Sequence, residues 1–354
     1  MVSTAMSAAA CESSDDGETG PEPYDGPPIP WAYEPFPAVV DPIDNPSSDA
    51  KVGLGRLLFY DPILSRDKLT ACATCHSEQW GMSDGLVVSV GVDGEGPTGP
   101  GRTGPNMTTR NAQTIWNAAF RSEFFWDGRA KSLEAQALEP LKAEPELDLD
   151  PSDAATRIRE IPEYVEMFDE AFPGEAQPIV PENIAKALAA FERTLVSSRA
   201  PYDRYVAGDE GALSDEQIQG MELFAEAGCA GCHVPPLFES NEYAMRVESS
   251  DDGRMAVTGE PADANAFRVP TLRNLRETGP FFHDGRVVDL NDAVWLEADV
   301  AASHGEGRVL TWDEVDLVAL FLRKALMDRS KEPDRPDEVP SGLPVPEDGL
   351  RIPR

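Results

Sequence analysis

The chain has 354 residues, of which 41% are hydrophobic, and it carries a formal net charge of −34. This length is typical of about two domains, and the hydrophobic content is sufficient for ordinary cores. The excess of acid argues against a nucleic-acid-binding protein, because phosphate contacts need clustered Lys and Arg. Such a charge either attracts a basic partner or simply keeps the protein soluble. No run of about 18 apolar residues is present, so no membrane-spanning helix is predicted.

Residues 1–35 are predicted to lie outside the folded part of the chain. The opening MVSTAMSAAAC is similar to the remnant of an export signal, and the small residues before Cys11 resemble a lipoprotein cleavage site. Cys11 is therefore a candidate for a lipid anchor, although the basic start and apolar segment of a complete signal are missing. The acidic, Pro-rich stretch that follows is predicted to be a disordered tether.

A short helix is predicted in KVGLGRLLFY, directly upstream of the first of two Cys-x-x-Cys-His motifs. These motifs, CATCH and CAGCH, contain four of the five cysteines, and they match the signature for covalent attachment of a c-type haem. In that chemistry two thiols bind the haem vinyl groups, and the adjacent His becomes the fifth iron ligand. We therefore predict two haems, attached through Cys72 and Cys75 with ligand His76, and through Cys229 and Cys232 with ligand His233.

Two other interpretations of the cysteines fit the sequence less well. A four-cysteine zinc site would have its pairs separated by roughly 15–20 residues, far fewer than here. A thioredoxin-like dithiol would not need a His after each pair. Haem attachment of this kind also predicts an exported, periplasmic location, with or without a membrane anchor.

Further helices are predicted in PENIAKALAAFERTL, where apolar residues recur at helical spacing, and over Leu310 to Leu326. Another is predicted in SDEQIQGMELFAEAG before the second motif, with Ser214 as its N-cap. No run of alternating strand residues is evident. The fold is therefore predicted to be mainly α.

A segment downstream of the first haem motif is repeated downstream of the second. FFWDGR begins at Phe124 and FFHDGR at Phe281, and only Trp126 is replaced, by His283. The likeness extends over Thr109 to Leu138 and Val269 to Val294. We therefore predict two tandem cytochrome c-like haem domains with loop-rich insertions, at 36–205 and 206–327, followed by an extended tail at 328–354.

In order and spacing these motifs resemble the bacterial di-haem cytochrome c peroxidase and MauG family, over roughly Pro46 to Met327. The resemblance rests on FYDPILSRDKLTACATCH, RNAQTIWNAAF, FFWDGRAKSLEAQAL, ALAAFERTLVSSRAPYDRY, CAGCH and FRVPTLRNLRETGPFFHDG. It implies that the N-terminal haem meets peroxide and that the C-terminal haem relays electrons.

The resemblance also implies roles for individual residues. Glu146, Gln136 and Pro140 fall on residues that line the open face of the peroxide haem, with Glu146 as the acid–base group and Gln136 orienting peroxide. Trp126 falls on the tryptophan between the haems, and His283 on a histidine that is not an iron ligand. A calcium ion between the domains is implied at Asn111, Thr278 and Pro280.

Two departures from the family pattern bear on the chemistry. Val92 stands sixteen positions after His76, where many of these peroxidases have a second His ligand. Valine cannot bind iron, so we expect the resting N-terminal haem to be five-coordinate or to hold water. Glu297 stands fourteen positions after His283, where the family has Met or Tyr as the sixth ligand of the other haem.

Three options therefore remain for the C-terminal haem: Glu297 as a ligand, His304 from the following loop, or no protein ligand. Met245 and Met255 lie in the wrong part of the unit. A carboxylate or imidazole should give a lower redox potential than Met does.

Three functions follow as hypotheses. The favoured one is a peroxidase that reduces hydrogen peroxide with electrons from a small, basic redox protein, a cytochrome c or a cupredoxin. The alternatives are a MauG-like oxidase acting on a partner protein or organic substrate, and a non-catalytic electron-transfer cytochrome. Val92, Gln136 and Glu146 speak against the last, because it needs both irons six-coordinate. The resemblance also allows a homodimer.

Overall fold

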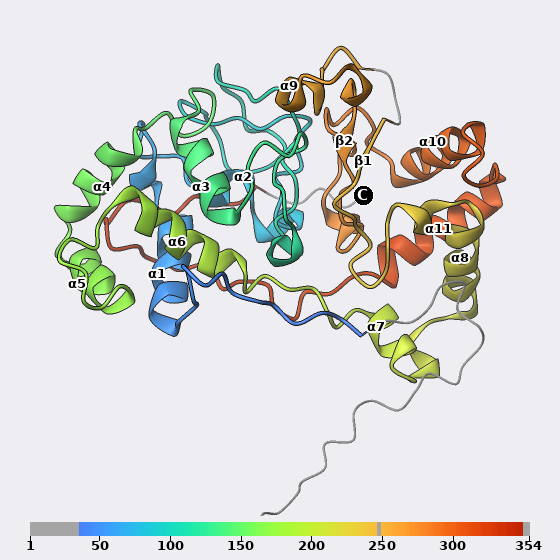
Figure 1. Ribbon diagram of the computed structural model, residues 1–354, viewed down its shortest axis with the longest axis horizontal. Helices are drawn as coiled ribbons and strands as arrows, with labels where there is room; N and C mark the ends of the chain where they lie inside the picture. Colours follow the sequence, from blue (N-terminus) through green and yellow to red (C-terminus); the bar gives the residue numbers. More distant parts are fainter. Residues whose placement is uncertain (1–34, 246–248, 350–354) are drawn as a thin grey trace, which may run out of the picture.

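The computed structural model describes residues 35–245 and 249–349, so the predicted export remnant and Cys11 lie outside the described residues. Within that part of the chain the fold is mainly helical, as predicted, with one antiparallel pair of short strands, β1 (Tyr243–Ala244) and β2 (Phe267–Arg268) (Figure 1). The helices are α1 (Asp49–Tyr60), α2 (Cys72–Cys75), α3 (Leu133–Lys142), α4 (Pro151–Arg159), α5 (Pro162–Ala171), α6 (Pro181–Glu192), α7 (Pro201–Val206), α8 (Asp215–Glu226), α9 (Met255–Thr258), α10 (Leu290–Ser303) and α11 (Trp312–Lys324). None of these described helices is long and apolar enough to cross a membrane.

Two helix crossings of the same design organise the fold. α1 packs against α6, and α8 packs against α11. At the first crossing a Cβ on Gly55 would lie 1.9 Å from the backbone oxygen of Ala187. At the second, a Cβ on Gly220 would lie 2.1 Å from the backbone oxygen of Leu317. Only glycine permits such a close approach of two backbones. A glycine therefore determines how closely the two helices pack at each crossing.

Aromatic rings pack beside both crossings, four residues after each glycine. The ring centroids of Phe59 and Phe191 lie 5.2 Å apart, and those of Phe224 and Phe321 lie 5.9 Å apart. The N-cap predicted at Ser214 is confirmed, because its hydroxyl accepts a hydrogen bond from the third residue of α8. The two halves therefore share both a helix pair and its packing.

Each crossing has its own hydrophobic core. The first core contains residues of α1 and α3 to α6, and the second contains residues of α7, α8, α10 and α11. Tyr202 belongs to the second core: its ring contacts Phe238, and its N–H donates to the Ala325 carbonyl at 2.9 Å. The boundary predicted between residues 205 and 206 therefore falls inside the second core, and α7 begins that half.

The C-terminal segment 328–349 forms no named helix or strand, and it packs along the first core. Figure 1 shows it in dark red, running from α11 back to α1. Val339 is buried in the first core. Arg335 pairs with Glu78 at 2.7 Å, and Ser341 Oγ donates to Asp61 at 2.7 Å. The tail is thus a strap that joins the two halves.

The duplicated segments adopt the same backbone. Asn117 and Asn274, at matching positions, both have left-handed φ angles, 60° and 59°, and each is followed by a short 3-10 helix. Matching β-bridges then close the two hexapeptide loops, one joining Phe124 to Ala130 and the other joining Phe281 to Val287. The sequence duplication is therefore a structural duplication, with Trp126 and His283 at equivalent places.

Candidate functional site

The first cavity, of about 410 Å³, lies beside the first haem motif. Cys75 and His76 line it from the C-terminal end of α2. The Nδ1 of His76 lies 3.1 Å from the carbonyl oxygen of Met82. This hydrogen bond places the proton on Nδ1 and leaves Nε2 as the nitrogen that can bind a metal. Burial lowers the pKa of His76, which keeps the imidazole neutral, as a metal ligand must be.

Gln136, Pro140 and Glu146 line the same cavity. Gln136 and Pro140 lie four positions apart on α3 and so share one face of that helix. Glu146 follows in the turn after α3, where its N–H donates to the Ala143 carbonyl at 2.9 Å. Burial raises the pKa of Glu146, the charge of Arg129 opposes this rise, and Glu139 adds to it. The cavity therefore joins an imidazole and a carboxyl group suited to proton transfer.

Val92 is fully buried, and it is not one of the residues that line this cavity. Its N–H donates to the backbone oxygen of Glu146 at 2.8 Å. The neighbouring Gly91 packs so tightly that a Cβ there would lie 2.2 Å from the backbone oxygen of Pro145 and 2.4 Å from that of Glu146. The segment that contains Val92 and Gly91 therefore packs against the backbone of Glu146.

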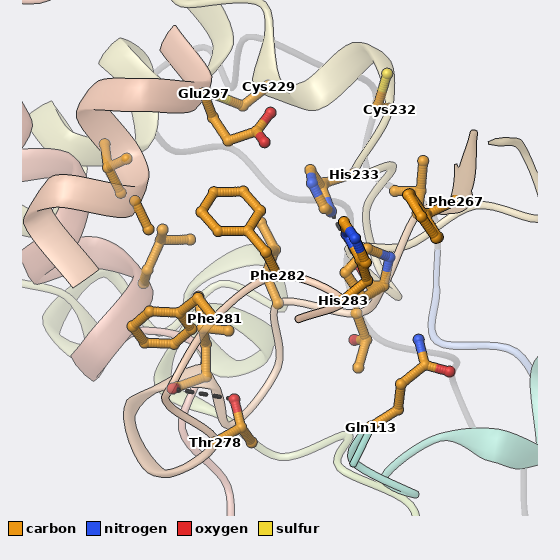
Figure 2. Close-up of a pocket in the computed structure, with 18 of the residues that line it drawn as sticks. Gln113, Cys229, Cys232, His233, Phe267, Thr278, Phe281, Phe282, His283 and Glu297 are labelled. Atoms are coloured by element: carbon orange, nitrogen blue, oxygen red, sulfur yellow. Dashed lines mark hydrogen bonds between the residues drawn. The ribbon is translucent and has the colours of Figure 1, made fainter. Parts of the chain in front are cut away.

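The second cavity, of about 210 Å³, lies beside the second motif (Figure 2). Cys229, Cys232 and His233 line it, and His233 Nδ1 lies 3.0 Å from the carbonyl oxygen of Pro270. The same tautomer argument applies, so Nε2 is the nitrogen that can bind a metal. The two motifs therefore present the same donor set, two thiols and one oriented imidazole.

α10 supplies one wall of the second cavity. Glu297 lines the cavity together with Val294 and Ala301, which lie three residues before it and four after it on the same helix face. Figure 2 shows the Glu297 side chain on the side of the cavity that carries Cys229. His304 is the exposed C-cap of α10 and is not among the lining residues. Of the two candidate ligands, the helix register therefore brings Glu297, and not His304, to the cavity.

Trp126 lines both cavities. Its Nε1–H donates to the carbonyl oxygen of Asn111 at 2.9 Å, and the N–H of Asn111 donates to the carbonyl oxygen of His283 at 2.7 Å. The rings of Trp126 and His283 lie 6.4 Å apart in an edge-to-face arrangement, and His283 stacks on Phe267 at 3.7 Å. The two copies of the hexapeptide therefore meet at the junction of the cavities, with Asn111 between them.

The three residues of the implied calcium site, Asn111, Thr278 and Pro280, all line the second cavity. The Nδ2 of Asn111 donates to the Leu86 carbonyl at 2.7 Å, so its Oδ1 is the side-chain atom left for a cation. Within residues 35–245 and 249–349, no three His, Cys, Asp or Glu side chains gather closely enough to hold a metal ion. A cation here would therefore depend on carbonyl and amide oxygens, the type of ligand that calcium accepts.

Several buried polar groups at the cavities were not predicted from the sequence. Gln113 Nε2, Glu192 Oε2 and Arg268 Nε are buried and have no hydrogen-bond partner among the described residues. Burial raises the pKa of Glu192 to about 8 and lowers that of Arg268 to about 10. Arg121 lines both cavities with Arg268, and both pair with Glu239, at 3.0 and 3.8 Å.

Such orphaned groups are costly unless another group occupies the cavity and bonds to them. The polar edge of a haem carries two carboxylates, which can accept hydrogen bonds from Gln113 and Arg268, and the thiols and imidazoles fit haem attachment. In the sequence Arg121 lies within the first duplicated segment and Arg268 directly precedes the second. Arginines are usually exposed, so nothing in the sequence distinguishes these two.

Comparison with known proteins gives a consistent result. Residues 49–211 match the family described as di-haem cytochrome c peroxidase. The chain is 36% identical over 302 residues to the cytochrome c551 peroxidase of Pseudomonas aeruginosa. This match covers 82% of this chain and 83% of that protein. It is 40% identical over 258 residues to the methylamine utilization protein MauG of Methylorubrum extorquens, covering 72% of this chain and 70% of that protein.

A solved structure gives the same answer for the fold. The crystal structure of a MauG-like protein associated with microbial copper homeostasis superposes with a TM-score of 0.71 and 27% identity, covering 85% of this chain and 97% of that one. The resemblance stated from the motifs is confirmed. The chain belongs to the di-haem cytochrome c peroxidase family.

Proposed function

We propose that the protein is a di-haem peroxidase that reduces hydrogen peroxide at the first cavity. The observation that carries the proposal is the pairing there of the oriented His76 imidazole with Glu146, a buried carboxyl group whose pKa is raised. The names of the relatives, cytochrome c551 peroxidase among them, support this activity. The proposal includes two cytochrome c-like haem domains, one around each helix crossing.

The haems would be held by Cys72 and Cys75 with His76, and by Cys229 and Cys232 with His233. When bound, the first haem would supply an iron that can bind peroxide and support cleavage of its O–O bond. Glu146 would accept a proton from one oxygen of the peroxide and return it to the other, which leaves as water, a general acid–base role worth about 10²–10⁴-fold in rate. Gln136 orients peroxide by hydrogen bonding, and Pro140 closes the wall beside it.

Trp126 provides an aromatic path between the two cavities, because it lines both. A calcium ion bound by Asn111, Thr278 and Pro280 would hold the two copies of the hexapeptide loop together. The electron donor would be a small redox protein with a basic face, since the chain itself carries a net charge of −34. The protein would work outside the cytoplasm, where c-type haems are attached.

A MauG-like oxidase is the second candidate, and the observation that favours it is Glu297 at the second cavity. A carboxylate ligand should give the second haem a lower potential than a Met ligand does. A haem of lower potential would donate electrons more readily, which would suit an oxidase that distributes oxidising equivalents between its two haem sites. The 40% identity to MauG supports this candidate as well.

Electron paramagnetic resonance of the resting ferric protein tests whether the first haem lacks a second protein ligand, as Val92 in place of a His predicts. We expect one high-spin haem, and the same sample should consume peroxide when a reduced cytochrome is supplied. A spectrum with only low-spin haem would mean that a protein atom fills the first site, and it would leave a protein that only transfers electrons.

A further inference from the structure

Two tryptophans stack on the outside of the second half of the molecule. Trp295 lies on α10 and Trp312 begins α11, with ring centroids 5.9 Å apart and planes 8° from parallel. Their exposed fractions are 38% and 55%. A large aromatic pair left in water is unusual on a soluble surface, and it marks a place where another molecule makes contact.

Carboxylates surround this pair. Asp292 and Asp299 lie three positions before and four after Trp295 on α10, and Asp316 lies four positions after Trp312 on α11. All three are exposed, and Asp313 beside Trp312 is exposed too. Arg308, which precedes α11, is paired with Glu314 and Glu226, at 2.7 and 2.9 Å, and Arg323 of α11 is paired with Asp289, at 3.9 Å. The tryptophan pair is thus an apolar centre inside an acidic rim.

The surface lies one helix away from the second cavity. The inner face of α10 lines that cavity through Val294, Glu297 and Ala301, whereas Trp295 lies on the outer face. An α-helix with its side chains is about 10–12 Å across, which sets the separation between the surface and the cavity wall. Figure 1 shows α10 and α11 at one edge of the molecule, on the side away from α4 and α5.

We propose that Trp295, Trp312 and their acidic rim form the docking surface for a small one-electron donor protein with a basic face. This inference rests on the proposed peroxidase function. Lys and Arg side chains of the donor meet the rim and the faces of the indoles, through ionic and cation–π contacts. A second copy of this chain would set carboxylates against carboxylates in a symmetric contact, and an anionic membrane would be repelled too.

The electron balance fits transient docking. At each encounter the reduced metal centre of the donor loses one electron, which enters this chain through α10. Two encounters supply the two electrons that, with two protons, convert one hydrogen peroxide into two waters. Electron-transfer encounters of this kind use small interfaces, so a tryptophan pair with a rim of four carboxylates is sufficient.

The test measures kcat/KM for a basic cytochrome c, supplied reduced, with hydrogen peroxide as oxidant. The docking variant is Asp292→Lys/Asp299→Lys. Its control is Glu163→Lys/Glu166→Lys on α5, at the opposite end of the molecule in Figure 1. Both double variants make the protein less negative by four charges, and each replaces one exposed carboxylate in the first turn of its helix. Net charge and helix stability therefore change alike in the two.

At an ionic strength of about 10 mM, kcat/KM of the docking variant should fall at least about tenfold, while that of the control should change less than about twofold. The difference should vanish at about 0.5 M salt. Trp295→Ala/Trp312→Ala should lower kcat/KM and weaken calorimetric binding of the oxidised cytochrome c at both salt concentrations, because apolar contacts are not screened. Equal losses in the two charge variants would overturn the proposal.

Hydroquinone, a small neutral reductant, separates this inference from the function on which it rests. All variants should reduce peroxide with hydroquinone at the unsubstituted rate, since no docking is needed. Loss of the hydroquinone rate in the tryptophan variant would show that the pair is structural, and would overturn the docking role. Absence of peroxide reduction with either donor in the unsubstituted protein would overturn the peroxidase function itself.

Discussion

Replacement of Gly91 by Ala tests whether the backbone beside Val92 positions Glu146. The added Cβ would lie 2.2 Å from the backbone oxygen of Pro145, whereas real Cβ atoms do not approach closer than 3.0 Å. The difference, 3.0 − 2.2 = 0.8 Å, is the least distance by which the segment must retreat. A misplacement of about 1 Å can cost about 10²-fold in rate. We expect kcat/KM for peroxide to fall between about 10- and 10²-fold.

The assay is peroxide consumption with a small reductant, together with thermal unfolding of the same samples. Crowding in a packed region should also lower the free energy of unfolding by about 1–3 kcal/mol. Gly53→Ala in α1 is the control, because a Cβ there meets nothing within 4 Å. That variant should keep its full rate and gain up to about 1 kcal/mol of stability. A Gly91→Ala protein that is folded and fully active would refute the positioning role.

Two further predictions concern charge at the two cavities. Glu146 must be ionised to accept a proton, so kcat/KM should be lost as the pH falls through its pKa, which burial raises above the ordinary value. Arg129→Ala should raise that pKa further and Glu139→Gln should lower it, so the acid limbs of their pH–rate profiles should move in opposite directions; movement in one direction would contradict the assignment. Glu297→Met should raise the redox potential of the second haem in a potentiometric titration, and an unchanged potential would mean that Glu297 does not bind the iron.

The features that can be predicted from the sequence are those that depend on residues close together in the chain. Each Cys-x-x-Cys-His motif contains both thiols for haem attachment and the ligating imidazole within five residues. The helices around Gly55 and Gly220 follow from their apolar spacing and caps. Residue spacing alone does not predict that Gln136 and Glu146 lie beside His76, because these residues are far apart in the sequence and meet only in the folded cavity. Only the family resemblance implies this arrangement.

Other features depend on contacts between distant segments, which no local pattern reports. The strap at 328–349 looks like a free Pro-rich tail in the sequence, yet Arg335 pairs with Glu78, 257 residues away. The second half of the molecule begins at α7 because Tyr202 packs against Phe238, which is distant in the sequence. The choice between Glu297 and His304 depends on where α10 ends, and helix ends are the least certain part of any prediction from sequence.

The most direct test of the account is the reaction of the ferric holoprotein with hydrogen peroxide, followed in a stopped-flow spectrophotometer with and without Glu146→Gln. The unsubstituted protein should react rapidly. The variant should have the same resting spectra and a second-order rate constant lower by about 10²–10⁴-fold, because Gln cannot accept the proton. Equal rate constants for the two proteins would contradict the central claim, which is that Glu146 performs proton transfer at an open first haem.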